Sequence, residues 1–293
     1  YLMGDGCLVH TSPEFIVGKR ALKDDFEEAV RAFGGIRSTY VEPGNRTPHI
    51  AVTNIEGKRG RGVTNPLTEW LRSIEMYGLD SHHKFIPACV LTLPKPQLAL
   101  FLNRLFATDG WISSTSSEIG YASVSEKLIR QLQHLLLRFR IIAGIRHRTI
   151  NSPTPGKTAW SLDITDGPSL VEFVQQIGVF GQEEKLDRFR RQFLESKFNT
   201  NNDTIPMEIW DAVRELKGDE TWVSLAHRAG IQSTARKVNI HVGKRAPSRT
   251  RMLQLAGALG SSSLTNLATS DVYWDKIIDI EPMGNNQVYD LTI

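Results

Sequence analysis

The sequence lacks several features that would assign a chain to a class at once. It has no run of roughly 18 or more apolar residues, so no segment is expected to cross a membrane as a helix. Its two cysteines, Cys7 and Cys89, form neither a C-x-x-C pair nor a disulfide framework, which indicates a reducing, cytoplasmic setting. It contains neither a G-x-x-x-x-G-K loop nor paired Cys/His spacings, so the sequence predicts neither a nucleotide-hydrolysing motor nor a zinc site. No charged-then-apolar leader opens it, and we expect the chain to start inside a longer protein.

What is present is a globular composition with a local excess of positive charge. The 293 residues are 40% hydrophobic and 23% charged, enough for two or three domains. The net charge of +3 is mild. However, residues 221–260 hold seven basic residues and no acidic one, which leaves 28 basic against 32 acidic residues elsewhere. Such segregation predicts an anionic partner for the basic segment.

A short motif near the start returns 104 residues later. Leu-Met-Gly-Asp-Gly at 2–6 is matched by Phe-Ala-Thr-Asp-Gly at 106–110. A helix is predicted over 96–107, before the second copy, because prolines suit its first turn and apolar residues recur at helical spacing. For the first copy, we expect the chain to begin partway through the corresponding helix.

Each copy is followed by the same order of predicted elements, which gives two αββαββα halves. After the first copy we expect strand-like pieces, a helix at 23–33, strands at 36–41 and 49–53, and a helix at 67–77. After the second we expect strands at 111–114 and 119–123, a helix at 126–140, strands at 145–150 and 159–164, and a helix at 169–177. The alternative is two unrelated Asp-Gly turns with coincidental flanks, which the matched motif, order and spacing disfavour.

The two motifs predict a shared acidic site. If the two helices pack side by side, Asp5 and Asp109 point at one spot, and the small residues Gly4, Ala107 and Thr108 let the backbones approach closely. Two carboxylates with helix-end carbonyls form an all-oxygen site, which suits Mg²⁺ better than zinc and can activate water for phosphodiester hydrolysis. One acid per half also suits the cutting of two antiparallel strands. The Asp-Gly dipeptide alone is a weak signal, because capping turns use it often.

A lysine follows each acid at a similar distance. Lys84 lies 79 residues after Asp5, and Lys185 lies 76 residues after Asp109. A lysine beside a scissile phosphate can orient the attacking water and offset developing charge. The ordinary alternative is a solvated surface lysine, but the equivalent spacing in both halves favours a shared role.

The stretch Phe-Leu-Asn-Arg-Leu-Phe-Ala-Thr-Asp-Gly at 101–110 resembles the second motif of intein-encoded LAGLIDADG homing endonucleases of the monomeric, two-repeat type. The resemblance implies a Mg²⁺-dependent endodeoxyribonuclease, with Mn²⁺ as a substitute, that breaks both strands of a long DNA site. It also implies saddle-shaped antiparallel sheets whose concave faces lie over the DNA and read bases in the major groove. The resemblance implies that Asp5 and Asp109 are the metal-binding acids. It implies that the carbonyls of the adjacent Gly4 and Thr108 complete the metal shell. The active-site lysines of the family correspond to Lys84 and Lys185.

The last 23 residues carry a second resemblance. The segments 271–277 and 288–293 resemble the strands before the C-terminal splice junction of inteins in bacterial replicative DNA helicases. The histidine, the terminal asparagine and the N-terminal nucleophile of splicing do not occur at the expected places in this sequence. We therefore do not expect the chain to splice by itself.

Between the two resembling regions lies a basic segment. A polar linker at 198–206 is followed by predicted short helices at 206–216, 221–229 and 248–259. These helices and their basic excess indicate a helix-turn-helix-like DNA-binding module, and a solvated structural insert is the alternative. Candidate DNA contacts are the basic residues of this module and of predicted loops in the two halves, namely Arg37, Arg46, Lys58, Arg59, Arg61, Arg146, Arg148, Arg236, Lys237, Arg245, Arg249 and Arg251.

The predicted fold class is therefore α+β. It has two pseudo-symmetric repeats at 1–93 and 94–197, a basic helical module at 198–269 and C-terminal intein strands at 270–293. We expect a bacterial, cytoplasmic monomer with internal pseudo-twofold symmetry that acts on double-stranded DNA and does not bind membranes. Two alternatives stay open: a DNA-binding regulator of the same fold that has lost cleavage, and a maturase that binds RNA.

Overall fold

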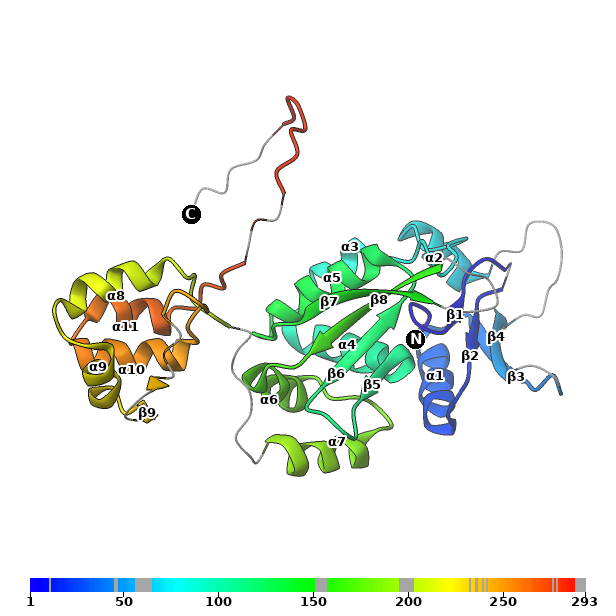
Figure 1. Ribbon diagram of the computed structural model, residues 1–293. Helices are drawn as coiled ribbons and strands as arrows, with labels where there is room; N and C mark the ends of the chain where they lie inside the picture. Colours follow the sequence, from blue (N-terminus) through cyan, green and yellow to red (C-terminus); the bar gives the residue numbers. More distant parts are fainter. Residues whose placement is uncertain are drawn as a thin grey trace. The chain divides into compact units, whose positions relative to one another are not determined.

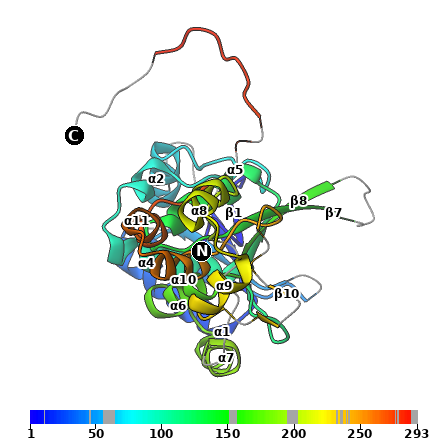
Figure 2. The ribbon, with the colours of Figure 1, turned by 60° about the vertical axis from the view of Figure 1, so that its left-hand side comes forward.

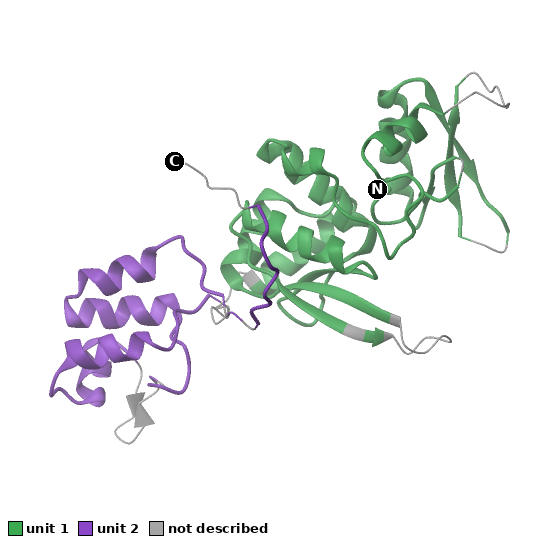
Figure 3. Cartoon of the chain, turned by 90° about the horizontal axis from the view of Figure 1, so that it is seen from above, with its two compact units in different colours: residues 1–202 green, residues 203–293 purple. Residues whose placement is uncertain are grey.

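The chain folds as two compact units. The computed structural model describes residues 1–10, 12–44, 47–55, 65–150, 157–194, 203–231, 233–234, 237–238, 240, 242–275, 277 and 279–287. Internal contacts divide the chain into residues 1–202 and 203–293, which Figure 3 draws in different colours. The first unit contains both predicted repeats, and the second contains the predicted helical module. In the part of the chain that is described, no helix combines the length and the apolarity needed to span a bilayer.

The first repeat contains one four-stranded sheet. Its elements in chain order are β1 (Gly6–Cys7), β2 (Glu14–Ile16), α1 (Arg20–Phe33), β3 (Ile36–Val41), β4 (His49–Asn54), α2 (Pro66–Ser73) and α3 (Ala88–Leu91). The strands are antiparallel and lie in the order β1-β2-β4-β3 (Figure 1).

The second repeat has the same connectivity. Its elements are α4 (Lys95–Asp109), β5 (Gly110–Ile112), β6 (Ile119–Ser123), α5 (Glu126–Leu137), β7 (Gly144–Ile150), β8 (Lys157–Ile164), α6 (Gly167–Gln176), α7 (Glu183–Phe189) and the π-helical turn η1 (Arg190–Leu194). The strand order β5-β6-β8-β7 repeats that of the first sheet, and all pairs are antiparallel. The α+β class and the predicted order of elements are therefore confirmed.

One helix of each repeat packs on its sheet through an apolar stripe. In α1 the buried residues Leu22, Phe26 and Val30 recur every four positions and so share one side of the helix. The ring of Phe26 lies 4.7 Å from that of Phe15 on β2. In the second repeat, α5 begins at Ser125, whose hydroxyl accepts a hydrogen bond from the backbone of Leu128. Both stripes join a single hydrophobic core that runs through the first unit.

Alternation along the strands gives each sheet a second, polar face. In the first sheet, positions that point into the core alternate along the strands with positions that point the other way. The second set includes Glu14, Arg37, Thr39 and Thr53. In the second sheet the corresponding positions include Arg146, Ser161 and Asp163. The guanidinium of Arg146 pairs with the carboxylate of Asp163 at 2.9 Å, so both side chains lie on this face. We call these two surfaces the polar faces.

The second unit is a small helical domain with its own core. Its elements are α8 (Ile209–Lys217), α9 (Trp222–Arg228), β9 (Ser233–Thr234), β10 (Lys237–Val238), α10 (Arg249–Leu259) and α11 (Ser262–Thr269) (Figures 1 and 2). Trp210, Val213, Leu225 and Met252 are all buried in this core. Of the four helices among the described residues of this unit, the sequence predicts three; it misses α11, which is rich in serine and threonine and becomes helical because Leu264 and Ala268 pack inward.

The prediction of C-terminal strands is wrong for the described part of that segment. Residues 271–275, 277 and 279–287 form neither helix nor strand, and 288–293 lie outside the described residues. A strand needs a neighbour for its backbone N–H and C=O groups. Within the described residues, no strand is paired with this segment.

Candidate functional site

The two acids of the repeated motif each lie directly before a glycine that begins a strand. Helix α4 ends at Asp109, and the backbone N–H of Gly110 donates to the carbonyl of Phe106. A Cβ at Gly110 would overlap that carbonyl, and a Cβ at Gly6 would overlap the carbonyl of Leu2. Only glycine therefore allows both tight passages into β1 and β5, which fixes each acid at the same point of its repeat.

The turn that carries Asp5 packs against the end of α4. A Cβ added to Gly4 would overlap the side chain of Thr108 and lie 3.1 Å from Oδ2 of Asp109. The missing side chain of Gly4 thus lets the two motifs meet. Burial and the charge of Asp5 raise the pKa of Asp109 to about 6, even though Tyr121 and Lys84 act in the opposite direction. Burial also raises the pKa of Asp5, against the lowering effect of Lys84. The structure therefore brings the two carboxyl groups to one place.

Lys84 lies buried between the two motifs. Its side chain is almost wholly shielded from solvent, and Nζ donates to the carbonyl oxygens of Gly4 at 2.6 Å and Gly6 at 2.8 Å, on either side of Asp5. Burial lowers the pKa of Lys84, while the charges of Asp109 and Asp5 raise it. An ammonium group is thus fixed within electrostatic range of both acids.

Residues from the second repeat hold the backbone around Lys84. The hydroxyl of Ser125 donates to the carbonyl of Lys84 at 2.6 Å while it caps α5. The side-chain amide of Gln131, six residues after Ser125 on α5, accepts a hydrogen bond from the backbone N–H of Ile86 at 2.7 Å. Lys84 belongs to the first repeat in sequence, but its position depends on the second.

The two halves of the site are not equivalent. In register, Gly110 faces Tyr121 and Gly6 faces Phe15. The fully buried Tyr121 donates its hydroxyl to Oδ2 of Asp109 at 3.3 Å, and burial raises the pKa of this tyrosine well above its usual value. Phe15 has no hydroxyl to offer Asp5.

The lysines differ as well. Lys185 lies on α7 and is only partly shielded, and no hydrogen bond or ion pair of its side chain is recorded among the described residues. The structure thus places Lys84, and not Lys185, in contact with the acidic site.

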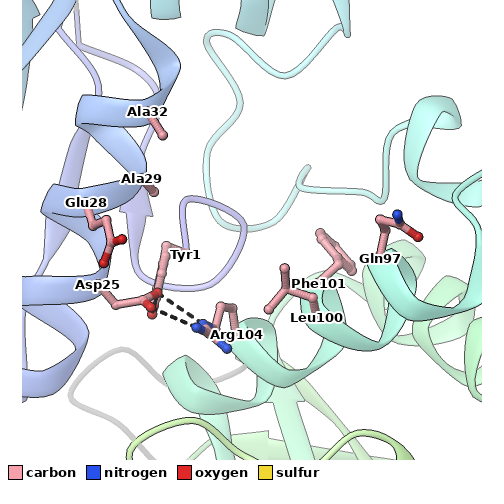
Figure 4. Close-up of a pocket in the computed structure, with 9 residues that line it drawn as sticks. All are labelled: Tyr1, Asp25, Glu28, Ala29, Ala32, Gln97, Leu100, Phe101 and Arg104. Carbon is pink, nitrogen blue, oxygen red and sulfur yellow. Dashed lines mark hydrogen bonds and ion pairs between the residues drawn. The ribbon is translucent and has the colours of Figure 1, made fainter.

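A salt bridge links the two repeats away from the acids. Arg104 of α4 donates to both carboxylate oxygens of Asp25 on α1, at 3.0 and 2.7 Å, and its guanidinium lies 4.0 Å from the ring centre of Phe180. Tyr1 donates its hydroxyl to the same carboxylate at 2.5 Å. Tyr1, Asp25 and Arg104 border a cavity of about 620 Å³ between α1 and α4 (Figure 4). Neither acid lines this cavity, so it is separate from the acidic site.

The acidic site fits a magnesium ion. Its two carboxylates supply oxygen donors, which Mg²⁺ prefers. Burial raises the pKa of both acids, and the charge of Asp5 raises that of Asp109 further, so a divalent cation would stabilise the ionised pair. The carbonyls of Gly4 and Thr108 stay predicted as further ligands, and that of Gly4 also accepts a hydrogen bond from the ammonium of Lys84 at 2.6 Å. Asp5 and Asp109 are the residues that would hold the ion.

The predicted DNA contacts divide into three groups. Arg37 and Arg146 lie exposed on the polar faces, and Arg245 is exposed in the second unit. Burial lowers the pKa of Arg251, which is only partly accessible. Outside the described residues or side chains lie Arg46, Lys58, Arg59, Arg61, Arg148, Arg236 and Lys237.

Arg249 has an internal role that its sequence context does not suggest. Its guanidinium pairs with Asp203 at 2.6 Å and donates to carbonyls at the end of α11, including those of Leu267 at 3.2 Å and Ser270 at 2.7 Å. A side chain with this many partners is not available to a phosphate, so we remove Arg249 from the candidate DNA contacts.

Sequence reasoning missed Tyr121, Ser125 and Gln131. The sequence does place Ser125 before an apolar helical stretch, which is the signal of a helix cap. Its contact with Lys84 spans 41 residues and has no local signal.

Comparisons with known proteins fit this arrangement. Residues 96–178 match the family model described as "LAGLIDADG-like domain". The replicative DNA helicase DnaB of Nostoc sp. (strain PCC 7120) is 30% identical over 315 residues, and that of Synechocystis sp. (strain PCC 6803) is 29% identical over 309. Both alignments cover 100% of this chain, but the chain spans only 34% of each relative.

Among solved structures, one of mesophilic variants of the homing endonuclease I-DmoI superposes with a TM-score of 0.43 and 11% identity, covering 64% of this chain and 92% of the other. The family match covers α4, with Asp109 at its end, and the whole sheet of the second repeat. Residues 96–178 are thus similar in sequence to the LAGLIDADG-like domain family.

Proposed function

We propose that this chain is a metal-dependent endonuclease that cuts both strands of a specific DNA site. One observation carries the proposal: Asp5 and Asp109, 104 residues apart, each lie directly before a glycine that begins a strand, and they meet beside the ammonium of Lys84, which is held on the carbonyls of Gly4 and Gly6. Two carboxylates and a fixed cation form the kind of site that hydrolyses phosphodiesters. The LAGLIDADG-like match of residues 96–178 supports the same class of enzyme.

The residues of the site have different roles. Asp5 and Asp109 would hold a divalent ion, which when bound polarises the phosphate and lowers the pKa of water. Lys84 uses two N–H groups on the carbonyls of Gly4 and Gly6, which orient a third N–H for a phosphate oxygen or the attacking water. Tyr121 positions the carboxylate of Asp109 through a hydrogen bond from its hydroxyl. Among the described residues, the tyrosine beside an acid belongs to the second repeat and the buried lysine to the first, so the two halves differ and we expect the two strands to be cut at different rates.

The polar faces provide the surface for DNA. Arg37 and Arg146 lie exposed there, one on each sheet, and Arg37 also donates to Thr53 on the neighbouring strand. Basic side chains on a sheet suit phosphate contacts, and the polar residues between them suit contacts with base edges.

The gene context of the proposed enzyme is an intein within a replicative helicase. The relatives named replicative DNA helicase DnaB align with the whole chain over about a third of their own length. The sequence of this chain has no G-x-x-x-x-G-K loop, so the chain lacks the phosphate-binding motif of a helicase motor. We propose that it is the inserted, endonuclease-bearing part, and that the intein-free host gene contains the DNA target.

Incubation of the chain with a plasmid that carries this intein-free gene tests the proposal. Linear product is expected with Mg²⁺ and none with EDTA. Asp5→Asn and Asp109→Asn should each abolish double-strand cutting while DNA affinity stays, and Asp187→Asn, at an exposed position on α7, is the matched control. Retained DNA binding without cleavage in the parent chain would instead identify a DNA-binding regulator. Binding and processing of RNA only would identify a maturase.

The lysines are tested as a pair. Lys84→Met keeps most of the side-chain volume and should slow cleavage by roughly 10²-fold, the scale of losing one electrostatic stabiliser. Lys185→Met is the matched substitution in the other half. Nicked intermediates, resolved by strand, measure which half each lysine serves; an unchanged rate for Lys84→Met would remove it from the mechanism.

A further inference from the structure

A second group of metal-ligand side chains lies on the β1–β2 hairpin. Cys7 and Glu14 face each other in register across the two strands, and His10 lies in the connection between them. The Sγ of Cys7, a ring nitrogen of His10 and a carboxylate oxygen of Glu14 all lie within 4.8 Å of one another. Nδ1 of His10 is 3.3 Å from Oε1 of Glu14. Three different donor atoms thus converge from three positions of one hairpin.

We propose that Cys7, His10 and Glu14 bind a thiophilic divalent cation of the zinc type. Thiolate sulfur, imidazole nitrogen and carboxylate oxygen are the donors that Zn²⁺ takes, with water in the fourth position where the protein supplies three ligands. Bond lengths of about 2.0–2.3 Å around a tetrahedral zinc place neighbouring ligand atoms roughly 3.3–3.7 Å apart. The distance from Nδ1 of His10 to Oε1 of Glu14 already has this value. Sγ of Cys7 lies within 4.8 Å of both other ligand atoms, so a small rotation of its side chain brings it into the coordination range.

The hairpin presents these ligands without a large rearrangement. Next to Cys7, the side chain of Leu8 is buried, and its carbonyl accepts from the backbone N–H of Gly78 at 2.9 Å. The β-pairing fixes Cys7 opposite Glu14. The side chain of His10 is 58% exposed, so a cation has access from solvent. Binding exchanges the thiol proton of Cys7 for the metal and releases that proton to water, with no change of oxidation state.

This site is distinct from the acidic site in its chemistry. Asp5 and Asp109 offer oxygen donors, which suit Mg²⁺, whereas sulfur and imidazole select softer ions. The sequence spacing alone does not predict this site, since C-x-x-H followed by a glutamate matches none of the paired Cys/His patterns.

A Co²⁺ titration of the full chain, followed by absorbance, tests the proposal. Cobalt takes zinc sites, and a sulfur-to-cobalt charge-transfer band arises only when a thiolate is a ligand. One equivalent is expected to produce this band, and Zn²⁺ should abolish it by displacing the weaker-binding cobalt. Cys7→Ser should remove the band, and His10→Ala should weaken Co²⁺ binding by at least about 10-fold, because loss even of outer partners costs that much.

Two controls separate this site from other thiols and from the acids. Cys89→Ser removes the other cysteine, which is exposed, and should leave the band unchanged. Asp109→Asn disables the proposed nuclease site and should leave it unchanged too, so failure of the nuclease and failure of this site are distinguishable. His10 is exposed, so His10→Ala keeps the fold, and circular dichroism verifies this. Absence of the band at stoichiometric Co²⁺, or its persistence in Cys7→Ser, would overturn the proposal.

Discussion

At the scale of single residues, Asp109 is an acid whose ionised form destabilises the metal-free protein. Its folded-state pKa of about 6 lies above the ordinary 3.8, so the folded protein binds a proton more tightly than the unfolded chain. Stability is therefore expected to fall as pH rises from about 4 to about 6, and to stay lowered above that. Asp109→Asn should raise the unfolding midpoint at pH 7.5 in EDTA, with a gain in the free energy of unfolding on the order of 1 kcal/mol because solvent screens this carboxylate, and should have little effect at pH 4.

Asp25 is the control with the opposite sign. Its hydrogen bonds from Arg104 lower the pKa of Asp25 below the ordinary value of 3.8. Its ionised form therefore stabilises the fold at a pH above 3.8, and this stabilisation is lost as the pH falls through the folded-state pKa. Asp25→Asn is expected to lower the unfolding midpoint at pH 7.5. If both variants move the midpoint in one direction at this pH, the electrostatic assignment of Asp109 is wrong.

Tyr121 gives a second prediction at this scale. Its hydroxyl stabilises the ionised form of Asp109, so Tyr121→Phe is expected to raise the pKa of Asp109 further. The ¹³C chemical shift of the Asp109 carboxyl group, followed with pH in EDTA, measures this directly. Tyr77→Phe is the matched control, because the ring of Tyr77 contacts Arg72 and its hydroxyl is not a recorded partner of either acid. An unchanged titration in Tyr121→Phe would mean that the hydroxyl does not act on the acid.

At the scale of elements, the start of α5 both caps a helix and positions Lys84. Ser125→Ala removes a cap worth about 1 kcal/mol and leaves the carbonyl of Lys84 without its hydroxyl partner, which adds about 1–3 kcal/mol. Ser261→Ala removes an equivalent cap from α11, where the second contact of the hydroxyl is with the exposed side chain of Ser263 at 3.0 Å rather than with a backbone carbonyl of another element. Urea unfolding should therefore show a larger loss for Ser125→Ala, and only this variant should slow cleavage. Equal losses in the two variants would show that the contact with Lys84 contributes nothing.

At the scale of the whole molecule, the described residues form two separate hydrophobic cores. No residue of the first unit's core belongs to that of the second, so a chain ending at residue 202 is expected to keep the fold of the first unit. If the second unit grips DNA, this truncation should shorten the footprint on one side and flatten the dependence of log affinity on log salt by about 0.9 for each lost phosphate contact. Cleavage position should not move, since both acids remain. An unchanged footprint and slope would identify the second unit as a structural insert.

The sequence by itself determined the local structure of this protein and the repetition of its halves. The strands at 36–41 and 119–123 have their predicted bounds, and the helices α1 and α5 are found within three residues of the predicted ends. Backbone conformation follows local patterns of apolar residues, glycines and caps, because period and capping act within a few residues. The same reasoning finds the repeated Asp-Gly motif.

Tertiary structure alone decided which charges have partners. Lys84 and Lys185 have matched spacings, yet only Lys84 is buried against backbone carbonyls of the motif, under a serine 41 residues away. Arg249 lies in a basic run, yet Asp203, 46 residues before it, holds its guanidinium inside the second unit. The C-terminal segment has strand-like sequence, yet its described residues pair with no strand. Burial, pairing and pKa depend on atoms that folding brings together from distant positions, and the free energy of a charge is set by those neighbours rather than by its place in the sequence.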